Sequence, residues 1–157
     1  MSKSTRATLA LAKAGADFEV LTYDYDPDAD RIGIQAAEAL GVSPSIVLKT
    51  LMAEVDGKPV CVVLPSDKEV SMKKLAAAFK GKSANMMKPA AAEKLTGYVV
   101  GGISAFGQRK QVPTVFEAEA MAHEAIFMNG GQRGLQVRLK PEAALKAANA
   151  ISASVIA

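Results

Sequence analysis

The stretch T-G-Y-V-V-G-G-I-S-A-F-G-Q-R-K-Q-V-P-T-V-F-E, residues 96–117, decides how this chain is interpreted. Residues 99–100 and 112–116 are rich in valine and predict strands on either side of a segment with few helix formers. Between them, the adjacent glycines Gly101 and Gly102 let the backbone take a positive φ and let another molecule approach closely. Successive N–H groups in such a turn attract carbonyl oxygens, carboxylates or phosphates. A plain β-turn is the alternative, and the glycine spacing by itself favours it.

The composition of the chain is typical of one globular domain. Its 157 residues can bury a sizeable core, and 50% of them are hydrophobic while 22% are charged. The apolar runs are too short for a membrane span, and no signal peptide is recognised. The single cysteine cannot form an internal disulfide, and no Cys/His cluster predicts a metal site. We therefore expect a single cytoplasmic domain over residues 1–157, without a metal, a cofactor or a membrane contact.

Hydrophobic periodicity predicts short helices mixed with strands. The turn Asp56-Gly57 predicts a β-hairpin, and the apolar run after it is typical of a central strand. The connections are too short for an all-parallel sheet, so the predicted fold class is α/β, with a curved, barrel-like mixed sheet flanked by short helices. Strands are expected over residues 17–25, 50–55, 59–65, 114–118, 124–128 and 135–139, and helices over residues 4–14, 34–40, 71–79, 89–95 and 141–148.

Few residues offer catalytic chemistry. His123 and Cys61 are single, and nothing around them indicates a catalytic triad, so Cys61 is interpreted as a core residue of an apolar strand. Lys49 lies at the entrance of a predicted strand, where an ammonium group can hold a carbonyl oxygen or a phosphate. An ordinary surface lysine is the alternative. The net charge of +3 permits contact with a nucleic acid, and the basic residues that could line one weakly are Lys68, Lys73, Lys74, Lys80, Lys82, Lys88, Arg109 and Lys110.

Three motifs in order resemble the YbaK/EbsC family: L-K-T-L at 48–51, T-G-Y-V-V-G-G-I-S at 96–104 and G-G-Q-R-G-L at 130–135. This family belongs to the superfamily of aminoacyl-tRNA editing domains related to the insertion domain of bacterial prolyl-tRNA synthetase. The likeness covers nearly the whole chain, and three ordered motifs are more specific than any one of them. The resemblance implies the fold of that superfamily and a deacylase that clears mischarged Cys-tRNA(Pro), with some activity on Cys-tRNA(Cys).

The resemblance also implies roles for individual residues. Lys49 matches the family's essential lysine, and Tyr23 matches a tyrosine of the pocket. Gly130 and Gly131 match a glycine-rich turn beside that pocket. The superfamily's glycine-x-x-x-proline loop, which cradles the aminoacyl carbonyl and the terminal adenosine, is matched by Gly101, Gly102, Ile103, Ser104 and Ala105.

Two residues depart from the family pattern. Ala105 stands where the loop usually has proline, so the fixed φ of that residue is lost. Gln136 stands where the family has an aspartate after R-G-L, which removes a negative charge near the expected site. Either change bears on which amino acid the site prefers.

The implied mechanism explains why the chain needs no strong nucleophile. In that mechanism the thiol of the substrate's own cysteine attacks its carbonyl and releases the tRNA. The expected partners are the acceptor end of an aminoacyl-tRNA and prolyl-tRNA synthetase. Two alternatives stay open: the same fold acting on an Ala- or Ser-charged tRNA, and a module that binds tRNA or a synthetase without turnover.

Overall fold

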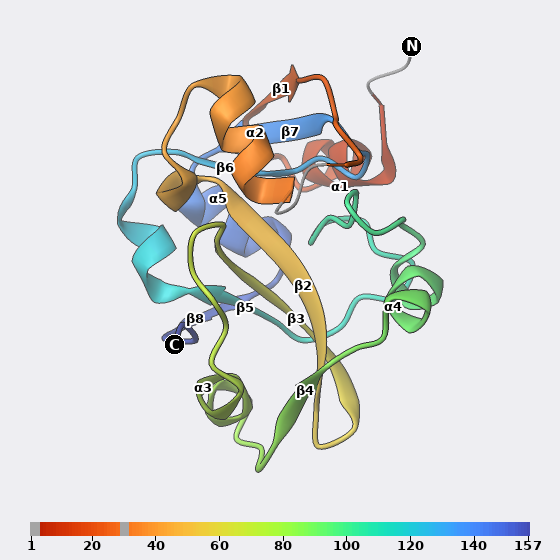
Figure 1. Cartoon of the computed structure of the whole chain (residues 1–157), viewed down its shortest axis with the longest axis vertical. Helices are drawn as coiled ribbons and strands as arrows, with labels where there is room; N and C mark the ends of the chain where they lie inside the picture. The colour runs from red at the N-terminus through yellow and green to blue at the C-terminus, as the bar shows by residue number, and fades with distance from the viewer. Residues whose placement is uncertain (1–3, 29–31) are drawn as a thin grey trace.

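The computed structural model describes residues 4–28 and 32–157, and a mixed five-stranded sheet forms its larger layer (Figure 1). The strand order is β4-β2-β3-β5-β8; β2 is antiparallel to both β3 and β4, whereas β5 is parallel to β3 and β8. β3 is central and buried over residues 60–65, which confirms the central strand predicted after the Asp-Gly turn. The strands are Ala84–Met86 (β4), Leu48–Val55 (β2), Lys58–Pro65 (β3), Thr114–Glu117 (β5) and Ile151–Ala153 (β8).

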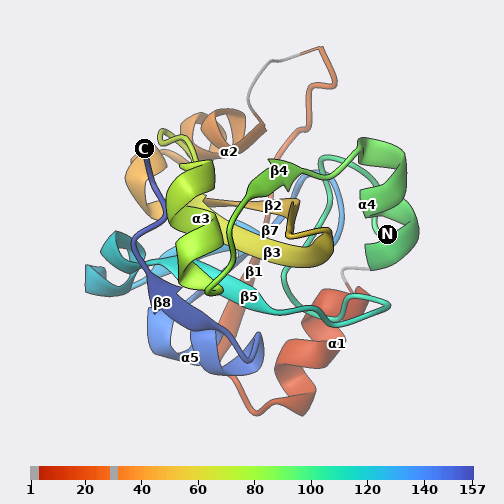
Figure 2. The same cartoon turned by 90° about the horizontal axis from the view of Figure 1, so that it is seen from below.

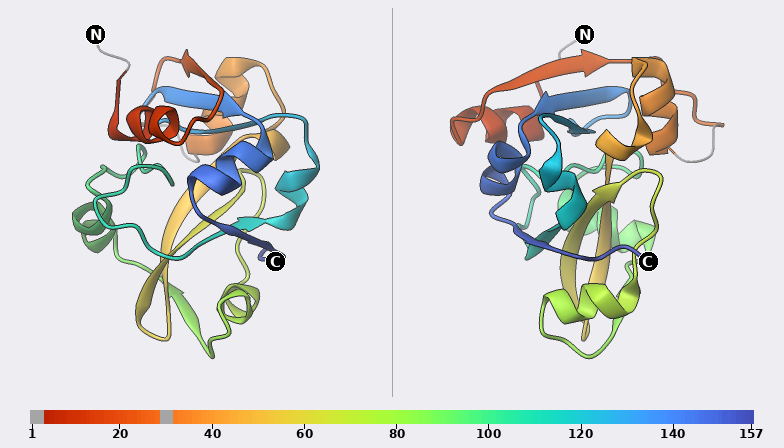
Figure 3. Two further views of the ribbon diagram at one scale, coloured as in Figure 1. Left: turned by 180° about the vertical axis from the view of Figure 1, so that it is seen from behind. Right: turned by 90° about the vertical axis from the view of Figure 1, so that its left-hand side faces the viewer.

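A second, antiparallel sheet has three strands in the order β1-β7-β6. A parallel bridge between Val47 and Phe127 connects it to the start of β2, so the two sheets meet at one corner (Figures 1 and 3). The mixed α/β class is therefore confirmed, with the strands divided between two sheets. These strands are Phe18–Thr22 (β1), Leu135–Leu139 (β7) and Ile126–Asn129 (β6).

Short helices cover the sheets: Ile32–Leu40 packs on the outer face of the smaller sheet and Met72–Ala78 on that of the larger one (Figures 2 and 3). Each helix expected from the sequence is found, with its bounds shifted by no more than two residues. None of the helices in the described residues is long and apolar enough to cross a membrane. The helices are Arg6–Lys13 (α1), Ile32–Leu40 (α2), Met72–Ala78 (α3), Pro89–Thr96 (α4) and Pro141–Ala147 (α5), with short 3₁₀ turns at Pro44–Ile46 (η1) and Ala118–Ala122 (η2).

The main core lies between the two sheets and is closed by α1 and α5. Alternate residues of β2 face opposite sides of the sheet, so Met52 packs into this core while Ala53 packs into a second cluster with Leu75 of α3. A third, smaller cluster lies between α2 and the start of β2. β2 is therefore held from both faces, and its exposed edge is fixed in place.

Some expected elements differ from the structure. Residues 99–100 form a turn rather than a strand, and Val99 and Val100 are 52% and 39% exposed. Their β-branched side chains have strand propensity but no neighbouring strand to pair with in the described residues, so tertiary context decides. β4 and β8 were not predicted, because a strand of three residues is too short to show alternation.

Candidate functional site

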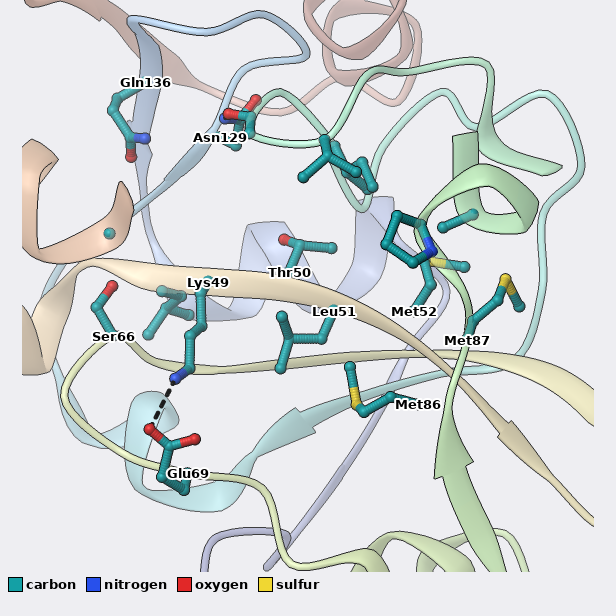
Figure 4. A pocket seen from close by; sticks show the side chains of 17 residues that line it. Lys49, Thr50, Leu51, Met52, Ser66, Glu69, Met86, Met87, Asn129 and Gln136 are labelled. Atoms are coloured by element: carbon teal, nitrogen blue, oxygen red, sulfur yellow. Dashed lines mark hydrogen bonds and ion pairs between the residues drawn. The ribbon is translucent and has the colours of Figure 1, made fainter. Parts of the chain in front are cut away.

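A cavity with a volume of about 390 Å³ lies along the outer edge of β2 (Figure 4). The bridge between Val47 and Phe127 bounds this edge at one end, and the bond from Met87 N–H to Met52 O (3.1 Å) bounds it at the other. Its wall is largely apolar, with a few polar groups, as is usual for small-molecule sites. The lining residues are Gly33, Leu48, Lys49, Thr50, Leu51, Met52, Ser66, Glu69, Met86, Met87, Pro89, Ala92, Val100, Gly101, Ile103, Asn129 and Gln136.

Thr50 presents polar groups to the cavity from the middle of this edge. Met52 turns its carbonyl outward to Met87, and in an antiparallel ladder alternate residues face the same side. The N–H and C=O of Thr50 therefore also point outward, away from β3. The hydroxyl of Thr50 is buried and makes no hydrogen bond with any described residue. A molecule in the cavity can meet both the backbone and the hydroxyl of Thr50.

Lys49 leaves β2 in the opposite direction and reaches toward the loop after β3 (Figure 4). Its Nζ atom lies 3.8 Å from Oε1 of Glu69, and the two side chains are 22% and 77% exposed. An ion pair that is this long and this exposed on one side contributes little stability. Breaking the ion pair with Glu69 would therefore cost little if an oxygen atom of a bound molecule took its place.

The loop of residues 100–105, called the Gly101 loop, is fixed by side chains that donate hydrogen bonds to its carbonyl groups. Arg133 Nε donates to Val100 O (3.0 Å), Asn129 Nδ2 donates to Gly101 O (2.9 Å), and Gln108 Nε2 donates to Ser104 O (2.9 Å). The C=O and N–H of one trans peptide point in opposite directions, so these bonds also orient the N–H groups that follow. Gly101 has a φ of +93°, which explains why glycine stands there.

Two residues of this loop can offer N–H groups to the cavity. Gly101 and Ile103 both line it, and their N–H groups have no acceptor among the described residues. Gly102, by contrast, donates to Val99 O (2.8 Å), and a Cβ there would lie 3.1 Å from the backbone nitrogen of Arg133. Gly102 thus allows two loops to pack closely.

Ser104 and Ala105 lie behind the loop, buried and outside the cavity wall. The Ser104 hydroxyl accepts the N–H of Phe106 (3.1 Å), which closes a local turn. Ala105 packs in the main core and takes no part in lining the cavity. The departure from proline at residue 105 therefore acts on the backbone of the loop and on core packing.

The turn of Gly130 and Gly131 supports the loop from behind. Gly131 donates its N–H to Asn129 Oδ1 (2.7 Å), and the Thr5 hydroxyl donates to Gly130 O. A Cβ at Gly131 would lie 3.0 Å from the ring of Tyr98. Neither glycine lines the cavity, so both shape the support of the site.

The half-buried Tyr23 and the buried Gln136 place two buried polar atoms at the end of the cavity under α2. Gln136 lines the cavity from β7 and is 3% exposed. Burial and the neighbouring Tyr25 raise the pKa of Tyr23, while the backbone of Gly134 and the side chain of Gln136 oppose this rise. Within the described residues, neither the Tyr23 hydroxyl nor Gln136 Oε1 makes a hydrogen bond of normal geometry. Buried polar atoms without partners are costly, so these atoms are suited to meet a polar ligand.

The structure brings Lys49, Gly101, Ile103 and Gln136 to one cavity, with Tyr23 beside Gln136. Thr50, Asn129 and the methionines of the wall were not singled out from the sequence. Asn129 directly precedes the glycine turn, and Thr50 directly follows Lys49, so proximity in the sequence was the available signal.

No alternative catalytic centre is visible in the described part of the chain. Burial raises the pKa of Cys61 to about 12, which keeps the thiol protonated and unreactive. No group of three or more His, Cys, Asp or Glu side chains within residues 4–28 and 32–157 could hold a metal ion.

Comparison with known proteins defines the class of this protein. Residues 26–147 match the model of the aminoacyl-tRNA editing domain, and the chain belongs to this family. The membership confirms the enzyme class predicted from the sequence, an aminoacyl-tRNA deacylase of the editing type.

Individual relatives carry more specific names. The chain is 38% identical over 130 residues to EbsC of Enterococcus faecalis, a candidate Cys-tRNA(Pro)/Cys-tRNA(Cys) deacylase, covering 81% of this chain and 79% of EbsC. It is 26% identical over 140 residues to the multifunctional Ser/Thr-tRNA deacylase ProXp-y of Escherichia coli K12, covering 86% and 81%. A crystal structure described as a candidate trans-editing enzyme for prolyl-tRNA synthetase has the same fold, with a TM-score of 0.85, 20% identity and 99% coverage of both chains.

Proposed function

We propose that this protein removes cysteine from mischarged Cys-tRNA(Pro), and also from Cys-tRNA(Cys), acting in trans. The observation that carries the proposal is one cavity that combines Lys49 with the Gly101 loop, while His123 and Cys61 lie outside its lining. The 38% identity to EbsC supports cysteine as the amino acid. Prolyl-tRNA synthetase is the partner that we expect to supply recognition of the tRNA body.

Lys49 and the Gly101 loop would bind different parts of the aminoacyl-tRNA substrate. The ammonium group of Lys49 would contact a phosphate or the carbonyl end of the substrate. The N–H groups of Gly101 and Ile103 would polarise the ester carbonyl, and one such donor contributes about 3 kcal/mol in known oxyanion holes. Neither role requires a side chain that attacks the ester.

The substrate would supply the nucleophile. The cysteine sulfur forms a bond to the ester carbonyl carbon, the bond from that carbon to the ribose oxygen breaks, and the ribose oxygen receives the thiol proton. The products are a free tRNA and a thiolactone, which water then opens to cysteine. Holding the two reacting groups together can supply up to about 7–11 kcal/mol in favourable intramolecular reactions.

A second candidate is a deacylase for an amino acid with a hydroxyl group. The unpaired polar atoms of Thr50, Gln136 and Tyr23 favour it, because they could bind a serine or threonine hydroxyl. The 26% identity to ProXp-y supports the same hypothesis of a hydroxyl-containing amino acid. In that case water would attack the ester in place of the thiol.

Deacylation assays separate these proposals. Cys-tRNA(Pro), S-methyl-Cys-tRNA(Pro), Ala-tRNA(Pro) and Ser-tRNA are each incubated with the wild type, with Lys49→Ala and with Lys58→Ala. Lys58 is an exposed lysine on the partner strand of the same hairpin and serves as the matched control. We expect clearance of Cys-tRNA(Pro) but not of its S-methyl form, a loss of about 100-fold or more in Lys49→Ala and no change in Lys58→Ala.

Other results of the deacylation assays would contradict the proposed activity or mechanism. Equal rates for the free and the S-methyl cysteine esters exclude the thiol step and leave hydrolysis by water. Clearance of Ser-tRNA or Ala-tRNA alone favours the alternative substrates. Binding of tRNA without hydrolysis of any ester would identify a binding module and overturn the proposal.

A further inference from the structure

Two arginines from distant parts of the chain meet at the C-terminal end of α4. Gly97 ends this helix with a φ of +82°. A Cβ at Gly97 would lie 2.5 Å from Nη1 of Arg6 and 3.5 Å from Nε of Arg109, so these two nitrogen atoms are no more than about 6 Å apart. Arg6 begins α1, whereas Arg109 belongs to the loop between the Gly101 turn and β5.

These arginines have no acidic partner in the described part of the chain. The ion pairs found there are Lys49–Glu69 and Arg138–Glu19, and neither involves Arg6 or Arg109. Both arginines are exposed, and the exposed Lys94 and Lys110 add further positive charge nearby in the sequence. Like charges held close together without an anion repel each other, so this cluster is suited to bind an anionic group.

The cluster lies within one helix length of the cavity. Pro89 and Ala92, in the first turns of α4, line the cavity, whereas Gly97 follows the last residue of the helix. Ala92 and Pro89 precede Gly97 by five and eight residues, so at about 1.5 Å per residue the rise from the cavity wall to the end of the helix is about 8–12 Å. Figures 1 and 2 place α4, the start of α1 and the loop that carries Arg109 on the same side of the molecule.

A nucleic-acid strand matches this spacing. Stacked nucleotides rise by about 3.4 Å each, so about two to four of them span a distance of this size. The phosphates of that strand would then reach the guanidinium groups, which match phosphate oxygens in geometry and charge.

We propose that Arg6 and Arg109 bind the phosphodiester backbone of an RNA strand whose 3′ end enters the cavity. The proposal rests on the proposed function, because a deacylase must hold the acceptor end of its substrate. Within this site, α4 sets the distance between the aminoacyl group and the contacted phosphates. The pair supplies affinity that does not depend on the base sequence.

A structural role for the same arginines makes a different prediction. Cations near the C-terminal end of a helix interact favourably with its macrodipole, and this would stabilise α4. If that were their only role, their removal would lower the melting temperature and leave RNA binding unchanged. The experiment therefore measures the melting temperature of every variant by thermal unfolding, in addition to its RNA binding.

The test uses a short RNA hairpin that has a single-stranded 3′ tail and carries no amino acid. Its binding is followed by fluorescence anisotropy between about 50 and 200 mM salt. The wild type is compared with the double variant Arg6→Gln/Arg109→Gln and with Arg138→Gln, an exposed arginine on β7. We expect the double variant to bind about tenfold more weakly at low salt, with a salt slope reduced by about 1 to 2, and the control to bind like the wild type.

A second arm uses an aminoacyl ester of adenosine, which carries no phosphate. The double variant should cleave this ester at the wild-type rate, because the cavity is untouched. The charge-preserving variant Arg6→Lys/Arg109→Lys should keep most RNA binding even if α4 is destabilised. Wild-type RNA binding in the double glutamine variant, or an equal loss in Arg138→Gln, would overturn the proposal. Since RNA binding is measured without hydrolysis, a failure of the deacylase assay is distinguished from a failure of this site.

Discussion

Asn129 joins the two glycine-containing segments that surround the candidate site. Its amide donates to the carbonyl of Gly101 and accepts the N–H of Gly131, and the residue is 9% exposed. One side chain therefore sets the distance between the loop and the turn. Because the held carbonyl fixes its peptide plane, Asn129 acts as a positioning residue for the loop that would bind the ester.

Two substitutions of Asn129 separate its two bonds. Asn129→Asp keeps the acceptor for Gly131 but loses the donor to Gly101, whereas Asn129→Ala loses both. We expect kcat to fall about tenfold in both variants with little change in KM, because the loop loses its fixed orientation. Loss of the buried bonds should lower the free energy of unfolding by about 1–3 kcal/mol in Asn129→Ala. Steady-state deacylation and urea unfolding measure these effects.

Asn85→Ala is the matched control for Asn129. Asn85 is exposed on β4, and its side-chain amide donates a hydrogen bond to the carboxylate of Glu54 at the surface. This variant should keep wild-type kcat and stability. An unchanged kcat in both Asn129 variants would show that the loop keeps its orientation without the amide.

At the scale of single residues, the sequence motifs mark residues that the fold brings to one cavity, while the tasks of these residues stay predictions. Lys49 and Gly101 line the cavity wall, and Gly130 and Gly131, expected beside the pocket, support this wall from behind. Thr50 was missed because an isolated threonine in a strand carries no pattern of its own. Its significance comes from a hydroxyl left unpaired at an open strand edge, which only the fold creates.

The first helix acts as an element of the site. Thr5 caps α1 by accepting the N–H of Thr8 (3.1 Å), and its hydroxyl also donates to the carbonyl of Gly130. The cap therefore links the start of α1 to the turn behind the Gly101 loop. Ser71 caps α3 in the same way by accepting the N–H of Lys74, and its hydroxyl makes no bond to a distant segment of the described chain.

Comparison of variants of Thr5 and Ser71 separates the effect of the hydrogen bond to Gly130 from the effect of the helix cap. Ser71→Ala should lower the free energy of unfolding by about 1 kcal/mol through loss of the cap alone. Thr5→Ala should lose a similar amount and about 1 kcal/mol more, because the carbonyl of Gly130 loses its donor. Thr5→Ala should also reduce deacylation, while Ser71→Ala should not. Equal unfolding energies and equal rates for the two variants would contradict the link.

At the scale of elements, length decided what the sequence could predict. Helices and the β2–β3 hairpin carry enough residues to show a period or a turn signal, and they were found. β4 and β8 each have three residues and pair only because longer strands place a partner beside them. The valines at 99 and 100 show the converse, since strand propensity without a partner produced an exposed turn.

The whole molecule places the residues of the candidate site where the two sheets meet. The edge of β2 remains open because β6 leaves it after the bridge at Phe127 and β4 joins it only from Ala53. Long-range placement of this kind also brings Arg6 and Arg109 together across more than 100 residues of sequence. Composition and periodicity contain no information about such pairs, which explains why the arginine cluster could not be predicted.

The same packing makes the stability of the whole molecule sensitive to alkaline pH. Cys61 is fully buried in the main core, where Gln108 Nε2 lies 3.8 Å from its sulfur. Burial raises the pKa of its thiol from 9.0 to about 12, so the folded chain keeps a proton that the unfolded chain releases. This contribution to stability is fully present below pH 9 and is lost as the pH rises through about 12.

The variant Cys61→Ala tests this dependence because it removes the titrating group from a buried strand. At neutral pH the variant should be less stable than the wild type, since it loses packing in the core. Above pH 9 the wild type should lose an additional 1.4 kcal/mol or so per pH unit relative to the variant, so the two curves approach each other. Urea unfolding at a series of pH values measures the difference directly, and the other titrating groups cancel from it. A gap that stays constant from pH 7 to pH 11 would mean that the thiol ionises as readily in the folded core as in the unfolded chain, and that Cys61 is not buried as described.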